Sequence, residues 1–401
     1  MIFALLTAAA LAEPDEAPPI EAYPPEESPP QPDDCAGHEV WPDASGWAAG
    51  ESPSPAAVSA FEAYAFPKPA PAVGADSAAV YGADREGVRT DGVVVIHRGR
   101  VVYERYDRGY TADTPHLTWS VSKSYINTLT GLAVAAGALS LDDSICEHID
   151  VAAESSCAIT VQHLLEFSSG LDWRETYENE PPTTSSVVAM LYGEGPADAV
   201  SFISGHPLRD PPGTTYAYSS GDTTLLSGVL KGALEETHGA DFPWTMLFDP
   251  IGVTSAVWER DQQGVLIGSS YVWSTPRDMA RLGYLFLSDG CWAGERLLPE
   301  GWVADSTAVS EPMKARRLYA DDDDVQGRQW WLNRAVPETG GTQRWPDLPE
   351  DTYAALGHWK QMIVVVPSLE LVVVRTGDDR DGTFSHNTFM TLAAGLVGEL
   401  E

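Results

Sequence analysis

The stretch Trp119-Ser120-Val121-Ser122-Lys123-Ser124-Tyr125 carries the sharpest chemical pattern in this chain. Ser120 and Lys123 stand three residues apart, and apolar residues recur at helical spacing from Lys123 to Ala136, just before Gly137. A helix over this range places both side chains on one face, about one turn apart. Its N-terminal N–H groups and its dipole stabilise negative charge, as a developing seryl alkoxide requires. The stretch therefore predicts a serine nucleophile with an amine beside it.

Serine and lysine also occur three apart by chance, so an N-cap serine followed by a surface lysine is an alternative interpretation. The lysine content favours a functional role, because only five of the 24 basic residues are lysines. A lysine that is partly desolvated in a cleft can lose its proton, whereas an arginine cannot. Lys123 is therefore predicted to act as a base in a chain that otherwise prefers arginine.

Two pairs of β-branched and aromatic runs predict β-hairpins. Residues 92–97 and 101–106 flank Arg98-Gly99-Arg100, which is a turn sequence. Residues 362–367 and 369–376 form the second pair, in strands expected to be mostly buried.

The sequence between the two hairpins differs in character. The range from about 144 to 255 is typical of short helices and long loops, and a final amphipathic helix is expected from about Asn387 to Leu400. Strands at both ends with helices between them predict an α+β body over residues 56–401, with a helical lobe over about 116–250.

The N-terminus has the features of an export signal. Ile2 to Leu11 is a short apolar run, and Ala10-Leu11-Ala12 has the small-x-small form of a cleavage site, so residues 1–12 are predicted to be a signal peptide. The run is too short to stay as a membrane span. Residues 13–55 are rich in Pro, Glu and Asp, which is typical of an extended linker. We therefore expect an exported protein, periplasmic or extracellular.

Four cysteines fit an oxidising compartment. Cys146 and Cys157 are close in sequence around a turn-like segment and form the first expected disulfide, which leaves Cys35 to pair with Cys291. Sequence alone allows three connectivities. A zinc site is the weaker alternative, because no Cys-x-x-Cys or His pair at metal spacing accompanies the cysteines.

The charge balance excludes some partners. Lys+Arg 24 against Asp+Glu 59 gives a formal net charge of −35, which repels nucleic acid and anionic membranes. A solubilising acidic surface is the simplest interpretation. Gly-x-Ser-x-Gly, His-Glu-x-x-His and phosphate-loop patterns are absent from the sequence, so the α/β-hydrolase, zincin and nucleotide-binding classes have no local support.

A second motif makes the pattern specific. In Pro212-Gly213-Thr214-Thr215-Tyr216-Ala217-Tyr218-Ser219-Ser220-Gly221-Asp222-Thr223, a turn precedes Tyr218 and a helix is expected to be capped around Asp222. Ser-x-x-Lys followed by this motif resembles the class C β-lactamase-related serine hydrolases, and within them the branch of 6-aminohexanoate-dimer hydrolase and related esterases. Further stretches with the same resemblance are residues 163–173, 274–283, 329–331 and 372–377.

The resemblance implies a β-lactamase/DD-peptidase-like fold, in which an antiparallel sheet flanked by helices and a helical lobe enclose the active site. It implies that Ser120 forms an acyl-enzyme and that Lys123 and Tyr218 share the transfer of the seryl proton to the leaving group. The Tyr218 phenol would need a lowered pKa for this, with a neighbouring Lys⁺ as the natural cause. The backbone N–H groups of Ser120 and Ala355 would form the oxyanion hole.

The inner strand departs from the β-lactamase pattern. A β-lactamase carries Lys-Thr-Gly there, whose cation helps to hold the substrate carboxylate, whereas residues 352–361 contain no such triplet. The resemblance makes Gly357, His358 and Trp359 candidates for the pocket, with ordinary strand residues as the alternative. Tyr177 stands where the esterase branch places a loop tyrosine that contacts substrate, although a solvent-exposed loop tyrosine is equally compatible with the sequence.

The expected activity is hydrolysis of a small ester or amide without a metal or cofactor. The alternatives are a peptidoglycan D-amino-acid peptidase or a β-lactamase, against which the missing triplet argues, and a catalytically silent penicillin-binding-like sensor. The sequence leaves the acyl substrate and the oligomeric state open.

Overall fold

The computed structural model describes residues 35, 40–43, 46–67, 87–177, 181–316, 324–337, 340–380 and 382–398. The predicted signal peptide and much of the predicted linker lie outside these residues.

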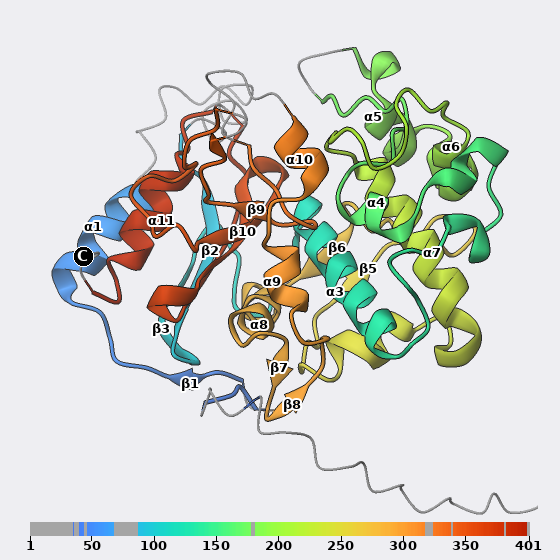
Figure 1. The fold of residues 1–401 in the computed structure, drawn as a ribbon. Helices are drawn as coiled ribbons and strands as arrows, with labels where there is room; N and C mark the ends of the chain where they lie inside the picture. The colour runs from blue at the N-terminus through green and yellow to red at the C-terminus, as the bar shows by residue number, and fades with distance from the viewer. Residues whose placement is uncertain are drawn as a thin grey trace, which may run out of the picture. The chain divides into compact units, whose positions relative to one another are not determined.

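A seven-stranded sheet forms the centre of the described fold (Figure 1). In spatial order its strands are β1 (Ala48–Ala49), β3 (Arg100–Tyr106), β2 (Thr90–His97), β12 (Leu371–Gly377), β11 (Gln361–Val366), β10 (Tyr353–Gly357) and β9 (Trp331–Leu332). Neighbours are antiparallel, except that β1 is parallel to β3. The β2–β3 and β11–β12 pairs confirm both predicted hairpins.

Both faces of the sheet are buried, because successive side chains alternate between two apolar cores. On β2, Val94 belongs to the core on the side of α8 (Pro276–Leu287), whereas Val95 belongs to the core on the side of α1 (Pro55–Ala65) and α11 (His386–Ala394). Burial on both faces explains why the central strands are nearly continuous apolar runs rather than alternating ones.

Helices inserted between β3 and the C-terminal strands form the helical lobe (Figure 1). They are α3 (Ser122–Ala135), α4 (Val161–Leu165), α5 (Ser186–Tyr192), α6 (Ala199–Ser204) and α7 (Ser220–His238). α7 contacts each of the other four helices. A second, three-stranded sheet consists of β4 (His116–Leu117), which precedes these helices, and of β6 (Val272–Ser274) and β5 (Val257–Trp258), which come after them. The remaining elements are β7 (Cys291–Trp292), β8 (Glu295–Arg296), α9 (Trp302–Ser306) and α10 (Glu311–Ala315).

The predicted helix after Lys123 is confirmed as α3, but the C-terminal helix is shorter than predicted. α11 ends at Ala394 rather than near Leu400, and Gly395 forms its C-cap. The described residues beyond it form turns up to Gly398. Two glycines in four residues make continuation of the helix unfavourable, which hydrophobic spacing alone does not reveal.

The two disulfides are Cys35–Cys291 and Cys146–Cys157, the pairing that the sequence favoured. The first fastens the chain before β1 to the body, where Trp41 packs on Tyr284 with ring centroids 5.3 Å apart. The described part of the predicted linker is therefore packed against the body rather than extended. None of the described helices is long and apolar enough to cross a membrane.

A buried ion pair joins β12 to the segment that follows it. Arg375 is 0% exposed and its guanidinium donates to the carboxylate of Asp379, which is 3% exposed. Arg375 also donates to Thr90 Oγ1 at 2.9 Å and to the carbonyl oxygen of Lys360 at 2.9 Å. Because this guanidinium donates hydrogen bonds to Thr90, Lys360 and Asp379, it joins three separate segments of the chain.

The substitution Arg375→Met is expected to lower the free energy of unfolding by about 3–5 kcal/mol, since it leaves a buried carboxylate uncompensated. Arg98→Met is the matched control, because Arg98 pairs with Glu370 while 67% and 46% of the two side chains are exposed. The control is expected to cost less than about 1 kcal/mol. Urea unfolding followed by circular dichroism measures both, and equal losses would contradict the structural role of the buried pair.

Candidate active site

The backbone around Ser120 is fixed by the small sheet. Thr118 donates from its N–H and from Oγ1 to the carbonyl oxygen of Val272, each at 2.9 Å. Val272 donates in return from its N–H to Ser122 Oγ at 3.2 Å. Between these anchors Trp119 takes a left-handed backbone conformation with φ of 51°, which turns the chain from β4 into the helix carrying Ser120. Such strained conformations are typical of functional sites, where the surroundings hold them in place.

Lys123 is buried beside Ser120, at 2% exposure. Its Nζ lies 3.0 Å from Ser120 Oγ, 2.9 Å from Ser220 Oγ and 3.1 Å from the carbonyl oxygen of Ser269. Burial lowers the pKa of Lys123 to about 8, against a smaller opposing effect of the Glu175 carboxylate. A substantial fraction of this lysine is therefore neutral near physiological pH, as a general base requires.

The neighbours of Nζ also determine which way a neutral amine would face. Ser220 Oγ donates its own proton to Glu175, so it accepts from Lys123. The Ser269 carbonyl oxygen can only accept. The two N–H bonds of a neutral Lys123 are thus directed at Ser220 and Ser269, and its lone pair is left for the Ser120 hydroxyl.

Tyr218 lies just before α7 and contacts both members of the pair. Nζ of Lys123 is 5.0 Å from the centroid of its ring, and Trp331 packs on that ring at 5.5 Å. Burial, and next the Glu175 charge, raise the pKa of Tyr218 above its ordinary value, although a hydrogen bond with Ser120 lowers it. The sequence-based expectation of a lowered Tyr218 pKa is therefore wrong, because desolvation and the Glu175 carboxylate outweigh the hydrogen bond with Ser120. The neutral phenol suits the role of proton donor better than that of base.

Glu175 is the site residue that the sequence analysis missed. Its carboxylate accepts hydrogen bonds from Trp173 Nε1 at 2.7 Å and from the Tyr177 hydroxyl at 2.6 Å. It also accepts from the backbone N–H of Ser220 at 2.9 Å and from the Ser220 hydroxyl. A glutamate in a loop carries no motif, and only the fold brings it to the start of α7.

A cavity of about 220 Å³ opens beside Ser120. Its lining residues are Ser120, Tyr177, Tyr218, Trp331, Arg344, Leu356, Gly357, His358, Trp359, Lys360 and His386. Two of the three predicted catalytic side chains, Ser120 and Tyr218, line this cavity. The third, Lys123, does not line it but lies directly behind Ser120, in hydrogen-bond contact with its Oγ. The pocket candidates Tyr177, Gly357, His358 and Trp359 line the cavity as well.

Ala355 is placed differently from the other candidates. It is 1% exposed in the middle of β10 and does not line the cavity, whereas Gly357 and His358 at the end of the strand do. Gly357 also approaches the carbonyl oxygen of Thr118 so closely that a Cβ would lie 2.3 Å from it. Among the described residues, no group of three or more His, Cys, Asp or Glu side chains could hold a metal ion.

Comparison with known proteins places this geometry in a family. The Beta-lactamase family profile matches residues 75–388. The chain belongs to the beta-lactamase family. A relative is the 6-aminohexanoate-dimer hydrolase of Paenarthrobacter ureafaciens, 26% identical over 259 residues that cover 60% of this chain and 64% of the relative. The match thus spans just under two thirds of that protein's length, and the resemblance predicted from the motifs is confirmed.

Solved structures of the family share the fold. EstCE1, described as a hydrolase with promiscuous acyltransferase activity, superposes with a TM-score of 0.63 and 15% identity over 85% of this chain and 98% of its own. A class C beta-lactamase mutant superposes with a TM-score of 0.52 and 18% identity over 77% and 92% of the two chains. The predicted α+β, β-lactamase-like fold is therefore confirmed, and the family to which this chain belongs is one of hydrolases with that fold.

The pKa of Lys123 predicts how the reactivity of Ser120 depends on pH. The rate of labelling by a fluorophosphonate should rise with pH and reach half its maximum near pH 8, because the neutral lysine is the reactive form. Glu175→Gln should move this midpoint to lower pH, since the carboxylate raises the lysine pKa. Gel fluorescence after timed labelling measures both. A flat rate between pH 6 and 10 would contradict the role of Lys123.

Proposed function

We propose that this protein is a serine hydrolase that cleaves an ester or amide through an acyl-enzyme on Ser120. The observation that carries the proposal is the 3.0 Å approach of Lys123 Nζ to Ser120 Oγ, with the lysine pKa lowered to about 8. A buried amine that is partly neutral can accept the seryl proton, and a serine at the start of a helix is favourably placed to carry developing negative charge.

In the acylation step, Ser120 Oγ attacks the substrate carbonyl carbon while its proton passes to Lys123 Nζ. The carbonyl π bond opens to an oxyanion, which then collapses and breaks the bond to the leaving group. The leaving oxygen or nitrogen takes a proton from the Tyr218 hydroxyl, and Lys123 returns its proton to Tyr218. Ser120 is the common neighbour of both groups, because Lys123 Nζ lies 3.0 Å from its Oγ and Tyr218 forms a hydrogen bond with it, which supports a proton path among the three side chains.

The oxyanion needs two backbone donors that face the cavity. The N–H of Ser120 is one of them in this proposal. For the second we favour the end of β10 at Gly357 and His358 over Ala355, because these two residues line the cavity and Ala355 does not. Deacylation follows by the same steps with water in place of Ser120, which restores the serine and releases the acid.

The site of action proposed here is outside the cytoplasm, in the periplasm or beyond the cell. Two disulfides support an oxidising compartment. The β-lactamase and silent-sensor alternatives are outcomes of the assay below, and stable labelling of Ser120 by a fluorescent penicillin would establish the peptidoglycan peptidase.

Ser120→Ala should abolish hydrolysis of p-nitrophenyl esters, and Lys123→Arg should lower kcat by at least about 100-fold, since arginine keeps the positive charge but cannot accept a proton. Lys314→Arg is the matched control for the second change, because Lys314 is a surface residue of α10 that pairs with Glu311. It should leave kcat unchanged. Release of p-nitrophenol measures all of these variants.

Short amides and nitrocefin in the same assay separate the alternatives. We expect esters or amides to be turned over and nitrocefin to be a poor substrate. Rapid hydrolysis of nitrocefin would establish the β-lactamase alternative instead. Wild-type protein that neither labels with fluorophosphonate nor turns over any of these compounds would establish the silent sensor.

A further inference from the structure

The charges that line the cavity beside Ser120 are opposite to the charge of the chain. The chain has 59 acidic and 24 basic residues. The lining nevertheless contains Arg344 and Lys360, together with His386, and no Asp or Glu. Burial lowers the pKa of His386 well below its ordinary value, so the charged residues of the lining are Arg344 and Lys360. A cavity with two cations and no carboxylate in so acidic a chain selects for negative charge in whatever enters it.

Lys360 is the most informative of these cations. It is half-buried, and its ammonium makes no hydrogen bond or ion pair with any residue that the structure describes. Burial, and next the charge of Arg344, lower the pKa of Lys360. A desolvated cation without a counter-ion is costly, so its position requires an explanation.

The backbone around Lys360 is strained and firmly held. Trp359 and Lys360 both have left-handed conformations, with φ of 53° and 72°, which residues other than glycine rarely adopt. Each carbonyl oxygen of the segment 358–360 accepts a hydrogen bond. The donors are Gln361 Nε2 to His358 at 3.1 Å, the N–H of Asp379 to Trp359 at 3.3 Å and Arg375 Nη1 to Lys360 at 2.9 Å.

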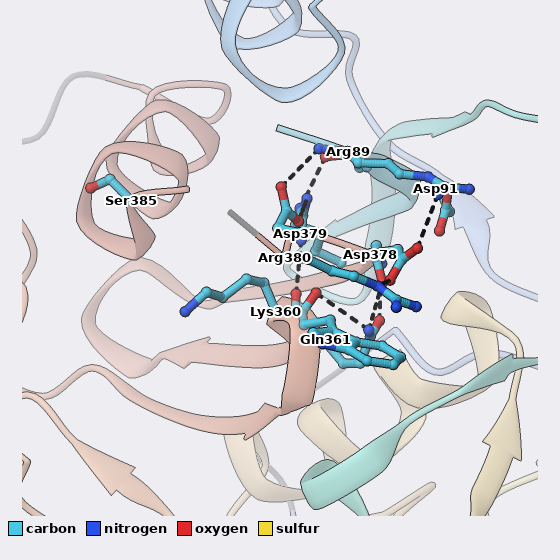
Figure 2. A network of polar contacts seen from close by, with 12 residues as sticks. Arg89, Asp91, Lys360, Gln361, Asp378, Asp379, Arg380 and Ser385 are labelled. Carbon is cyan, nitrogen blue, oxygen red and sulfur yellow. Dashed lines mark hydrogen bonds and ion pairs between the residues drawn. The ribbon is translucent and has the colours of Figure 1, made fainter. Parts of the chain in front are cut away.

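Figure 2 shows the result of these contacts. The side chain of Lys360 extends away from the polar cluster of Arg89, Asp378 and Asp379, on the side where Ser385, the N-cap of α11, lies. The guanidinium of Arg380 packs on the Trp359 ring 3.6 Å from its centroid, which holds that side chain in place. The fold thus uses a buried network to hold a strained segment that directs one lysine into the cavity.

Arg344 supplies the second charge. It pairs with Asp324, and its guanidinium lies 4.6 Å from the centroid of the Trp331 ring. Because Trp331 also packs on Tyr218, this cation borders the same cavity as the catalytic residues.

We propose that Lys360, with Arg344 beside it, forms an anion subsite, so that the preferred substrate is an ester or amide that carries a carboxylate or similar anionic group away from the scissile bond. This inference rests on the hydrolase function proposed above and narrows its substrate class. Binding of such a group gives Lys360 the counter-ion that the described protein does not provide. The anionic group belongs either to the acyl part or to the leaving group, and the two arms of the test distinguish these sources.

In the acyl arm, the mono-p-nitrophenyl ester of adipic acid is compared with its methyl ester, which is neutral and of similar shape. In the leaving-group arm, 3-carboxy-4-nitrophenyl butyrate is compared with p-nitrophenyl butyrate. The measured quantity is the ratio of kcat/KM for the anionic ester to that for the neutral ester. We expect this ratio to favour the anion in one arm by about tenfold or more, the size of one charge-assisted hydrogen bond.

Lys360→Gln should lower the favoured ratio about tenfold, and Lys360→Arg should largely retain it. Lys314→Gln removes the same charge from an exposed site and should leave the ratio unchanged, which separates a local subsite from overall charge. A ratio near one in both arms for the wild type, or an unchanged ratio in Lys360→Gln, would overturn the subsite. Loss of Ser120-dependent turnover of the neutral esters themselves would instead overturn the proposed hydrolase function, so the two failures are distinguishable.

Discussion

The chemistry of this site depends on one buried amine whose three polar neighbours leave it a single free direction. Lys123 Nζ lies among Ser120, Ser220 and Ser269, and burial lowers its pKa to about 8. Since the Ser220 hydroxyl is committed to the Glu175 carboxylate and the Ser269 carbonyl can only accept, the lone pair of the neutral amine faces the nucleophile. Desolvation supplies the neutral form of the amine that can accept a proton, and the hydrogen bonds supply its direction.

The rest of the fold keeps these groups in register. The short 3-10 helix Trp119–Val121 carries the serine and α3, which follows it directly, carries the lysine. The start of α7 carries Ser220 beside Tyr218, and the loop with Glu175 completes the network from a further segment. On the other side of the cavity, the sheet presents the end of β10, which the buried pair of Arg375 and Asp379 braces through the carbonyl of Lys360. One continuous apolar core joins the two sides of the cavity, since Tyr125 of α3, Leu225 of α7 and Ala355 of β10 all belong to it.

Local patterns predicted the parts of the structure that local physics determines. Both hairpins and α3 followed from residue periodicity, and the disulfide of Cys146 with Cys157 followed from proximity in sequence. The Ser-x-x-Lys pair could be recognised because its two residues lie one helical turn apart. Its assignment as a catalytic pair depended on Tyr218 and on the order of the family motifs.

Properties that depend on three-dimensional surroundings could not be predicted in this way. Glu175 stands in a loop without a motif, and the direction of the Tyr218 pKa shift depends on how completely the fold buries that phenol. Which residue of β10 faces the cavity depends on where the strand ends. Gly357 and His358 at its end line the cavity, whereas Ala355 does not. Only the structure shows the left-handed backbone at Trp359 and Lys360 and the direction that it gives the lysine.

The most direct measurement is an NMR titration of Lys123. Because the chain has five lysines, labelling with [¹³Cε]lysine gives few signals, and Lys123→Arg identifies the one of interest. Lys123 should titrate with a midpoint near pH 8. A Lys123 midpoint above pH 10 would mean that the amine stays charged in the fold, which contradicts its assignment as the base that activates Ser120.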